Sequence, residues 1–190
     1  MKTAIILHGM PDKEDYYNPA YDAESNCHWL PWIQRQLTVQ NILAQTPEMP
    51  EPYTPNYEKW CSVFSQFKID EDTTLVGHSC GAGFLVRWLS ENKLKVGKLV
   101  LVAPWTDPTN ELGDKNTFFD FVIDSKLVER TEGVYIFNSS NDEDVIHKSV
   151  ENILDALPDV QLVKLQDKGH FTLSGMGTRE FPELASVILD

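Results

Sequence analysis

The stretch Gly77-His78-Ser79-Cys80-Gly81 decides the fold, because it joins the apolar run at 73–76 to a helical pattern at 82–91. A glycine on each side of the turn lets the backbone reverse tightly and lets the helix pack closely against its strand. A serine at the tip of such a strand–turn–helix unit is held with its hydroxyl directed away from the sheet. The stretch therefore predicts a buried strand, a sharp turn with Ser79 at its tip, and a helix.

A serine that acts as a nucleophile needs a histidine as its base and a carboxylate that orients the histidine. His170 follows the apolar run at 160–165, and Asp142 follows a strand-like run at 134–138. All three side chains come just after predicted strands, and the carboxyl ends of parallel strands share the edge at which open α/β sheets bind ligands. The sequence therefore predicts a catalytic triad of Ser79, Asp142 and His170.

Apolar runs and helical patterns alternate along the whole chain. Strands are predicted at 3–7, 40–45, 73–76, 98–103, 134–138 and 160–165. Helices are predicted at 29–38, 57–67, 82–91, 117–123, 143–157 and 178–189, with a long loop at 10–28. This alternation predicts an α/β fold in which a parallel sheet of six strands lies between two layers of helices. Neither a repeat nor a linker divides the pattern, so we expect a single domain over residues 1–190.

Composition and charge restrict the class of protein. The chain has 190 residues, of which 42% are hydrophobic and 24% charged, as in ordinary globular domains. Its formal net charge of −13 disfavours nucleic acid and anionic membranes as partners. The apolar stretch at 4–7 is too short to be expected to act as a signal peptide, no apolar run is as long as a membrane helix, and the three cysteines lack a zinc-binding spacing. We therefore expect a cytoplasmic protein that uses no metal and no cofactor.

The motifs resemble those of the α/β-hydrolase superfamily, and within it the small serine hydrolases related to the retinoblastoma-binding protein hydrolase. The resemblance is carried by His8-Gly9 after the first strand, the motif at 77–81, Asp142 with Val145 three residues later, and Gly169-His170-Phe171. It implies a minimal hydrolase with strand order 2-1-3-4-5-6 and no separate cap domain. The spacing of Asp142 and Val145 favours Asp142 over Asp144, although either carboxylate can cap the helix that follows.

Chemistry and resemblance predict the same mechanism. Ser79 attacks an acyl carbonyl, His170 takes the proton of the hydroxyl, and Asp142 orients the imidazole. The backbone N–H groups of Met10 and Cys80 are the predicted donors of the oxyanion hole. The predicted function is that of a carboxylesterase-like serine hydrolase that cleaves a small-molecule ester through an acyl-enzyme.

Other residues and functions stay open at this point. The tentative substrate pocket consists of His8, Trp105, Phe118 and Phe119, and a packing role is equally open for His8. A thioester or an amide is a less favoured substrate than an ester. The main alternative function is a protein-binding module on a hydrolase scaffold, since fold does not imply function. A lyase or haloperoxidase-like use of the same triad is a further alternative.

Overall fold

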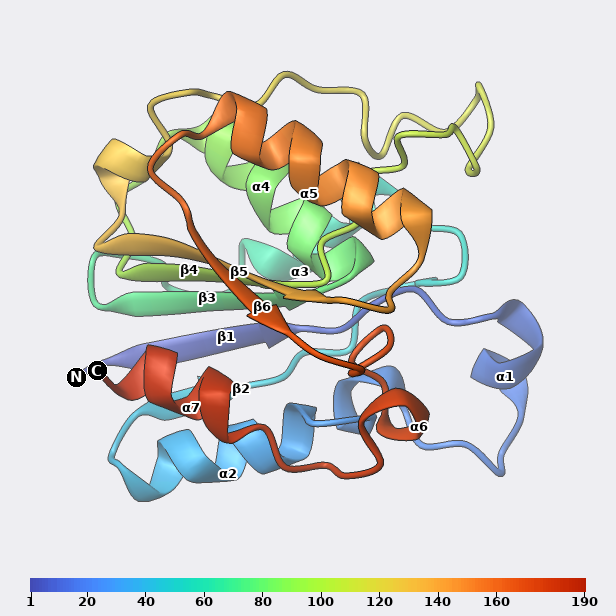
Figure 1. Cartoon of the computed structure of the whole chain (residues 1–190), viewed down its shortest axis with the longest axis horizontal. Coiled ribbons are helices and arrows are strands. Elements are labelled where there is room, and N and C mark those ends of the chain that lie inside the picture. Colours follow the sequence, from blue (N-terminus) through green and yellow to red (C-terminus); the bar gives the residue numbers. More distant parts are fainter.

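A computed structural model describes residues 1–190, and in it the chain forms three layers, with one sheet between two sets of helices (Figure 1). The strands are β1 (Thr3–Leu7), β2 (Leu43–Gln45), β3 (Thr73–His78), β4 (Lys98–Val102), β5 (Gly133–Ser139) and β6 (Gln161–Leu165). All neighbouring strands are parallel, and their order is β2-β1-β3-β4-β5-β6. The predicted fold class and strand order are therefore confirmed.

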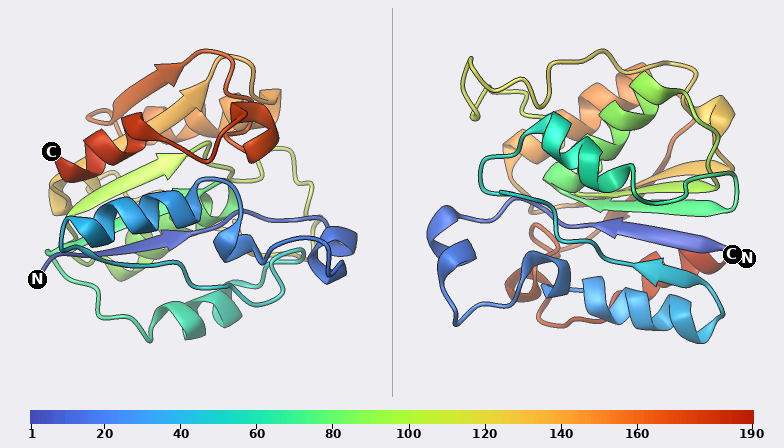
Figure 2. Two further views of the ribbon diagram at one scale, coloured as in Figure 1. Left: turned by 90° about the horizontal axis from the view of Figure 1, so that it is seen from below. Right: turned by 180° about the vertical axis from the view of Figure 1, so that it is seen from behind.

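Helices cover both faces of the sheet. One face packs against α2 (Leu30–Val39) and α7 (Pro182–Leu189), and the other against α3 (Tyr57–Phe64), α4 (Cys80–Asn92) and α5 (Asp144–Ala156), as Figures 1 and 2 show. Two short helices, α1 (Lys13–Tyr17) and α6 (Leu173–Met176), lie beyond the carboxyl ends of the strands (Figure 1). None of the helices combines the length and the apolar character needed to span a bilayer.

The core consists of strands that are apolar over nearly their whole length. Every residue of β1 and β4 after the first is buried, as expected for strands with helices on both faces. Aromatic rings fill the spaces between sheet and helices. The rings of Trp60 and Phe118 lie 5.0 Å apart on one side, and those of Phe137 and Phe181 lie 5.2 Å apart on the other. This packing fixes the strand ends from which the loops of the candidate site begin.

The helix predicted at 117–123 does not form, so that prediction is wrong. The Arg87 guanidinium donates to the carbonyl groups of both Thr117 and Phe118, which a helix would use for its own hydrogen bonds. The Phe118 ring is buried against Trp60. The segment therefore follows an irregular path in which a side chain satisfies the backbone.

Smaller differences concern loops. The predicted loop at 10–28 contains α1 and a 3-10 turn, Glu24–Asn26, and α6 was not predicted. Strand β2 begins at Leu43 rather than at residue 40, because the chain leaves α2 through Asn41 with a positive φ of 59°. These corrections leave the sheet and its order unchanged.

Two glycines in the first turn of α4 allow this helix to pack directly against the main chain of neighbouring segments. A methyl group at Gly81 would overlap the carbonyl oxygen of His8 at the end of β1. A methyl group at Gly83 would overlap the carbonyl oxygen of Trp105 and lie 2.6 Å from the Phe119 ring. The position of α4 thus depends on the absence of side chains at its start.

We expect Gly83→Ala to lower the free energy of unfolding by about 2 kcal/mol, because the methyl group meets backbone that cannot move away. The same substitution in an unobstructed helix raises stability by roughly 1 kcal/mol, so the sign of the change is diagnostic. Lys93→Gly, at the end of the same helix, should raise stability by about 0.5–1 kcal/mol, since Lys93 has a φ of 55°. Urea unfolding of both variants measures the two effects, and a stabilising Gly83→Ala would contradict the packing described.

Candidate active site

Ser79 lies in the turn between β3 and α4, with φ 53° and ψ −119°. A residue other than glycine is strained in such a conformation by on the order of 1–3 kcal/mol, so its surroundings must hold it there. The Ser79 N–H donates to the Val102 carbonyl at 2.9 Å, and the Ser79 carbonyl accepts from the Trp105 N–H at 3.1 Å. Ser79 is thus tied to the end of β4, while the residue keeps 9% of its surface exposed.

Asp142 and His170 come from the loops after β5 and β6 and meet at the same edge of the sheet. The His170 Nδ1 lies 3.0 Å from Asp142 Oδ1 and 3.3 Å from Oδ2. The Asp142 side chain is completely buried, whereas 26% of the His170 side chain is exposed. Asp144, the alternative carboxylate, begins α5 and is exposed. The structure therefore pairs His170 with Asp142.

A clamp of short polar side chains joins the two loops. The Ser139 hydroxyl accepts from the Lys168 N–H at 2.9 Å, and Asn141 Oδ1 accepts from the Gly169 N–H at 2.8 Å. The Ser139 hydroxyl also donates to Asn141 Oδ1 at 2.8 Å. Neither Ser139 nor Asn141 was predicted as a site residue, and in the sequence they appear only within a run of small polar residues directly after a predicted strand. The clamp holds the loop that carries His170 against the loop after β5.

Two further histidines lie beside His170, and both are neutral. The His78 Nε2–H donates to the His170 carbonyl at 2.8 Å, and the rings of the two residues are 5.1 Å apart. His28 Nδ1 accepts from the Leu173 N–H at 3.1 Å. Burial lowers the pKa of His78 well below its usual value, and burial together with the nearby His170 lowers the pKa of His28 to about 4. These rings therefore orient the loop after β6 without adding positive charge to it.

The two backbone N–H groups predicted to form an oxyanion hole are both unpaired. Neither Met10 N–H nor Cys80 N–H donates to an acceptor of the protein. The backbone of Gly9 comes so close to the nucleophile turn that a methyl group there would lie 3.1 Å from Ser79 Cβ. Cys80 is the first residue of α4, where the helix dipole adds partial positive charge. One free donor thus comes from the loop after β1 and the other from the start of α4.

The residues proposed to line a substrate pocket have internal partners. Trp105 and Phe118 are buried, and the ring of Phe119 packs 5.3 Å from that of Trp105. Both ring nitrogens of the buried His8 are hydrogen-bonded to main-chain groups. These contacts favour a packing role for the three aromatic residues.

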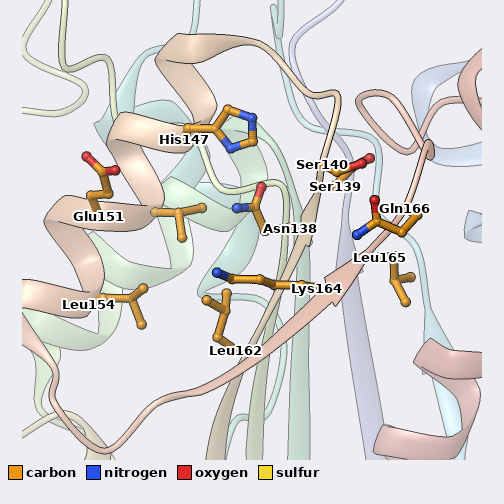
Figure 3. Close-up of a pocket in the computed structure, with 11 residues that line it drawn as sticks. Asn138, Ser139, Ser140, His147, Glu151, Leu154, Leu162, Lys164, Leu165 and Gln166 are labelled. Atoms are coloured by element: carbon orange, nitrogen blue, oxygen red, sulfur yellow. The ribbon is translucent and has the colours of Figure 1, made fainter.

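A cavity of about 380 Å³ lies between α5 and β6, beside the clamp (Figure 3). Its lining includes Asn138 and Ser139 from β5 and Lys164 from β6. None of the three residues predicted to be catalytic borders it. The cavity is therefore separate from the space in front of Ser79.

A model of the serine hydrolase family matches residues 16–189. The chain belongs to this family. YdeN of Bacillus subtilis (strain 168) is 29% identical over 182 residues, which cover 93% of this chain and 94% of YdeN. The crystal structure of the ydeN gene product matches with a TM-score of 0.81 and 25% identity, over 100% of this chain and 97% of that one. Serine hydrolase RBBP9 of Rattus norvegicus is 27% identical over 167 residues, which cover 84% of each chain.

Membership of the serine hydrolase family confirms the resemblance seen in the sequence motifs. This serine hydrolase matches both relatives over more than four fifths of its length and has the α/β-hydrolase fold. The chain is therefore a hydrolase, and its serine turn, its histidine–aspartate pair and its unpaired N–H groups are the parts from which a specific reaction can be argued.

Because the backbone of Ser79 is strained, substitutions at this position should change the free energy of unfolding, and this can be tested without measuring activity. Ser79→Gly should raise the free energy of unfolding by about 1 kcal/mol, because glycine adopts this backbone conformation without strain. Ser79→Ala removes the same hydroxyl but keeps the strain, so it should stay within about 0.5 kcal/mol of the native protein. Urea unfolding separates the two variants, and equal stabilities would mean that the turn is not strained.

The lowered pKa of His28 predicts how stability depends on pH. The pKa is about 4 in the folded protein and near 6.5 when unfolded, so the unfolded state binds more protons between these values. Protonation of His28 therefore does not reduce the free energy of unfolding above pH 6.5, and it reduces this free energy progressively as the pH falls from 6.5 towards 4. His28→Asn keeps an acceptor for the Leu173 N–H and tolerates the positive φ of 55° but cannot be protonated.

Stability should therefore fall less steeply between pH 6.5 and 4.5 in His28→Asn than in the native protein. Glu24 acts in the opposite direction, since burial and the nearby Glu48 raise its pKa to about 7, but it is common to both proteins. Urea unfolding at a series of pH values measures the difference, and parallel curves would contradict the burial of a neutral His28.

Proposed function

We propose that this serine hydrolase cleaves small carboxylic esters through an acyl-enzyme formed on Ser79. The observation that carries the proposal is the hydrogen bond of 3.0 Å between His170 Nδ1 and the buried Asp142, at the sheet edge where the serine turn also lies. Acyl transfer requires a serine, a histidine that acts as its base and a carboxylate that orients the histidine, and the contact between histidine and carboxylate is present here.

The proton transfers follow from the bond to Asp142. That carboxylate accepts the Nδ1–H of His170, which leaves Nε2 as the nitrogen that can take a proton. Nε2 removes the proton of the Ser79 hydroxyl as the oxygen attacks the ester carbonyl, and returns it to the leaving alcohol. Water then repeats these steps on the acyl-enzyme and releases the acid. Asp142 stabilises the imidazolium that forms in each half of the reaction.

The developing negative charge on the carbonyl oxygen needs donors that are already in position. The unpaired N–H groups of Met10 and Cys80 are suited to this role, because they need not break an internal hydrogen bond to accept it. The start of α4 adds the positive end of a helix dipole. Loss of one such donor costs on the order of 10²–10³ in turnover in comparable sites.

The preference for a small, uncharged ester rests on two observations. The residue Ser79 keeps only 9% of its surface exposed, so a bulky group has little access to its hydroxyl. The formal net charge of −13 disfavours the approach of acidic substrates. An ester is favoured over an amide because alkoxide leaving groups need less assistance than amines.

The test combines covalent labelling with hydrolysis. A fluorophosphonate probe should label the native protein and fail to label Ser79→Ala. Ser65→Ala, which removes an exposed serine directly after α3, should be labelled as the native protein is. p-Nitrophenyl acetate should be hydrolysed faster than the octanoate ester and far faster than p-nitroacetanilide. Asp142→Asn should lower kcat by roughly 10⁴-fold.

Asp144→Asn serves as the matched control for the carboxylate and should keep nearly full activity, because Asp144 does not contact His170. Labelling of Ser79→Ala to the native extent would contradict the role of this serine. A folded native protein that neither reacts with the probe nor hydrolyses any of the esters would instead favour a binding module on a hydrolase scaffold.

A further inference from the structure

His8, the last residue before the glycine loop that leaves β1, is buried and uses both ring nitrogens. Its Nδ1 lies 2.7 Å from the Gly9 carbonyl oxygen, and its Nε2 lies 2.9 Å from the Met49 nitrogen. The Trp60 ring packs against the imidazole edge to face, with 6.0 Å between centroids. The imidazole is therefore fixed between the loop after β1 and the segment that follows β2.

The partners of the ring define its tautomer. A backbone N–H can only donate, so the Met49 N–H requires an unprotonated Nε2. The single proton of the neutral ring is then on Nδ1, and it is donated to the Gly9 carbonyl. Burial keeps the pKa of His8 below its usual value against the opposing charge of Glu48, whose Oε1 is 4.0 Å from Nε2. His8 is thus a neutral donor to Gly9.

The hydrogen bond to the Gly9 carbonyl also affects the Met10 N–H, which belongs to the same peptide group. The Gly9 carbonyl and the Met10 N–H belong to one planar trans peptide and point in opposite directions. Glycine leaves this peptide plane free to rotate unless a hydrogen bond holds it. The bond from His8 therefore fixes the direction of the Met10 N–H, which has no partner within the protein.

We propose that His8 is a positioning residue of the oxyanion hole, holding the Gly9 carbonyl so that the Met10 N–H is directed at the substrate oxygen. The inference rests on the proposed function, since it presupposes that Ser79 forms an acyl-enzyme. It replaces the earlier assignment of His8 to the wall of a substrate pocket. His8 acts through a peptide group and does not touch the substrate.

A purely structural role would use the other ring nitrogen. Nε2 anchors Met49, and the carbonyl of the next residue, Pro50, accepts from Trp60 Nε1 at 3.0 Å. If His8 serves only to attach this segment to the core, activity depends on the bond at Nε2. If His8 orients the oxyanion hole, activity depends on the bond at Nδ1. The two roles can be separated because each nitrogen can be replaced alone.

Asparagine and glutamine make this separation. His8→Asn places an amide near the position of Nδ1 and can still donate to the Gly9 carbonyl, but it cannot reach Met49. His8→Gln places its amide oxygen near the position of Nε2 and can still accept from Met49, but it cannot donate to Gly9. Each variant is compared with the native protein for kcat and KM on p-nitrophenyl acetate, the rate of labelling by a fluorophosphonate probe, and the thermal unfolding temperature.

We expect His8→Gln to lower kcat and the labelling rate by about 10- to 100-fold, with KM changed by less than about threefold, because a misaligned donor is lost mainly in the transition state. His8→Asn should keep kcat within about threefold of the native value even if it unfolds at a lower temperature. Nitrogen NMR of the native protein should show a protonated Nδ1 and an unprotonated Nε2 on His8.

Three results would overturn the proposal, and they differ from failure of the proposed function. If His8→Gln is active while His8→Asn is folded but inactive, His8 serves only to anchor the segment that contains Met49. Equal activity of both variants and the native protein would remove any positioning role. A neutral His8 ring with its proton on Nε2 would contradict both the bond from Met49 and the donation to Gly9. A native protein that the probe does not label would instead reject the hydrolytic role of Ser79 itself.

Discussion

The rest of this structure depends on a close approach of backbone segments where β1 and β3 end. Methyl groups at Gly77 or Gly81 would meet main-chain atoms, and one at Gly9 would meet Ser79 Cβ at 3.1 Å. Because no side chain separates these segments, the loop after β1 and the start of α4 both lie close to Ser79. The strained conformation of Ser79 and the unpaired donors on either side of it both result from this packing.

Much of this arrangement can be predicted from sequence, because buried parallel strands have no polar face and stand out as apolar runs. The turn at 77–81 likewise marks the start of α4, and the positions of Asp142 and His170 follow from the strands before them. The remaining features depend on partners far apart in the chain. Arg87 binds the carbonyl groups of Thr117 and Phe118 where a helix was predicted, and the aromatic residues near the site pack in the core. The spacing of apolar residues along the sequence does not reveal contacts between segments that lie far apart in the chain.

Histidines at the carboxyl edge of the sheet divide into two kinds. His8, His28 and His78 each have a tautomer set by a backbone partner, and their pKa values are lowered, chiefly by burial. His170 instead has a carboxylate as its hydrogen-bond partner and is partly exposed. The neutral rings thus join main-chain segments, whereas the His170 ring is hydrogen-bonded to a side chain.

The clamp between the loops after β5 and β6 has a consequence for motion. Ser139 and Asn141 bind the segment before His170, so the imidazole and the carboxylate of Asp142 travel together when β6, an edge strand, shifts. Ser79 is attached instead to β4, two strands away in the sheet. A second attachment, from the His78 Nε2–H to the His170 carbonyl, limits this motion relative to the serine turn, because His78 directly precedes Ser79.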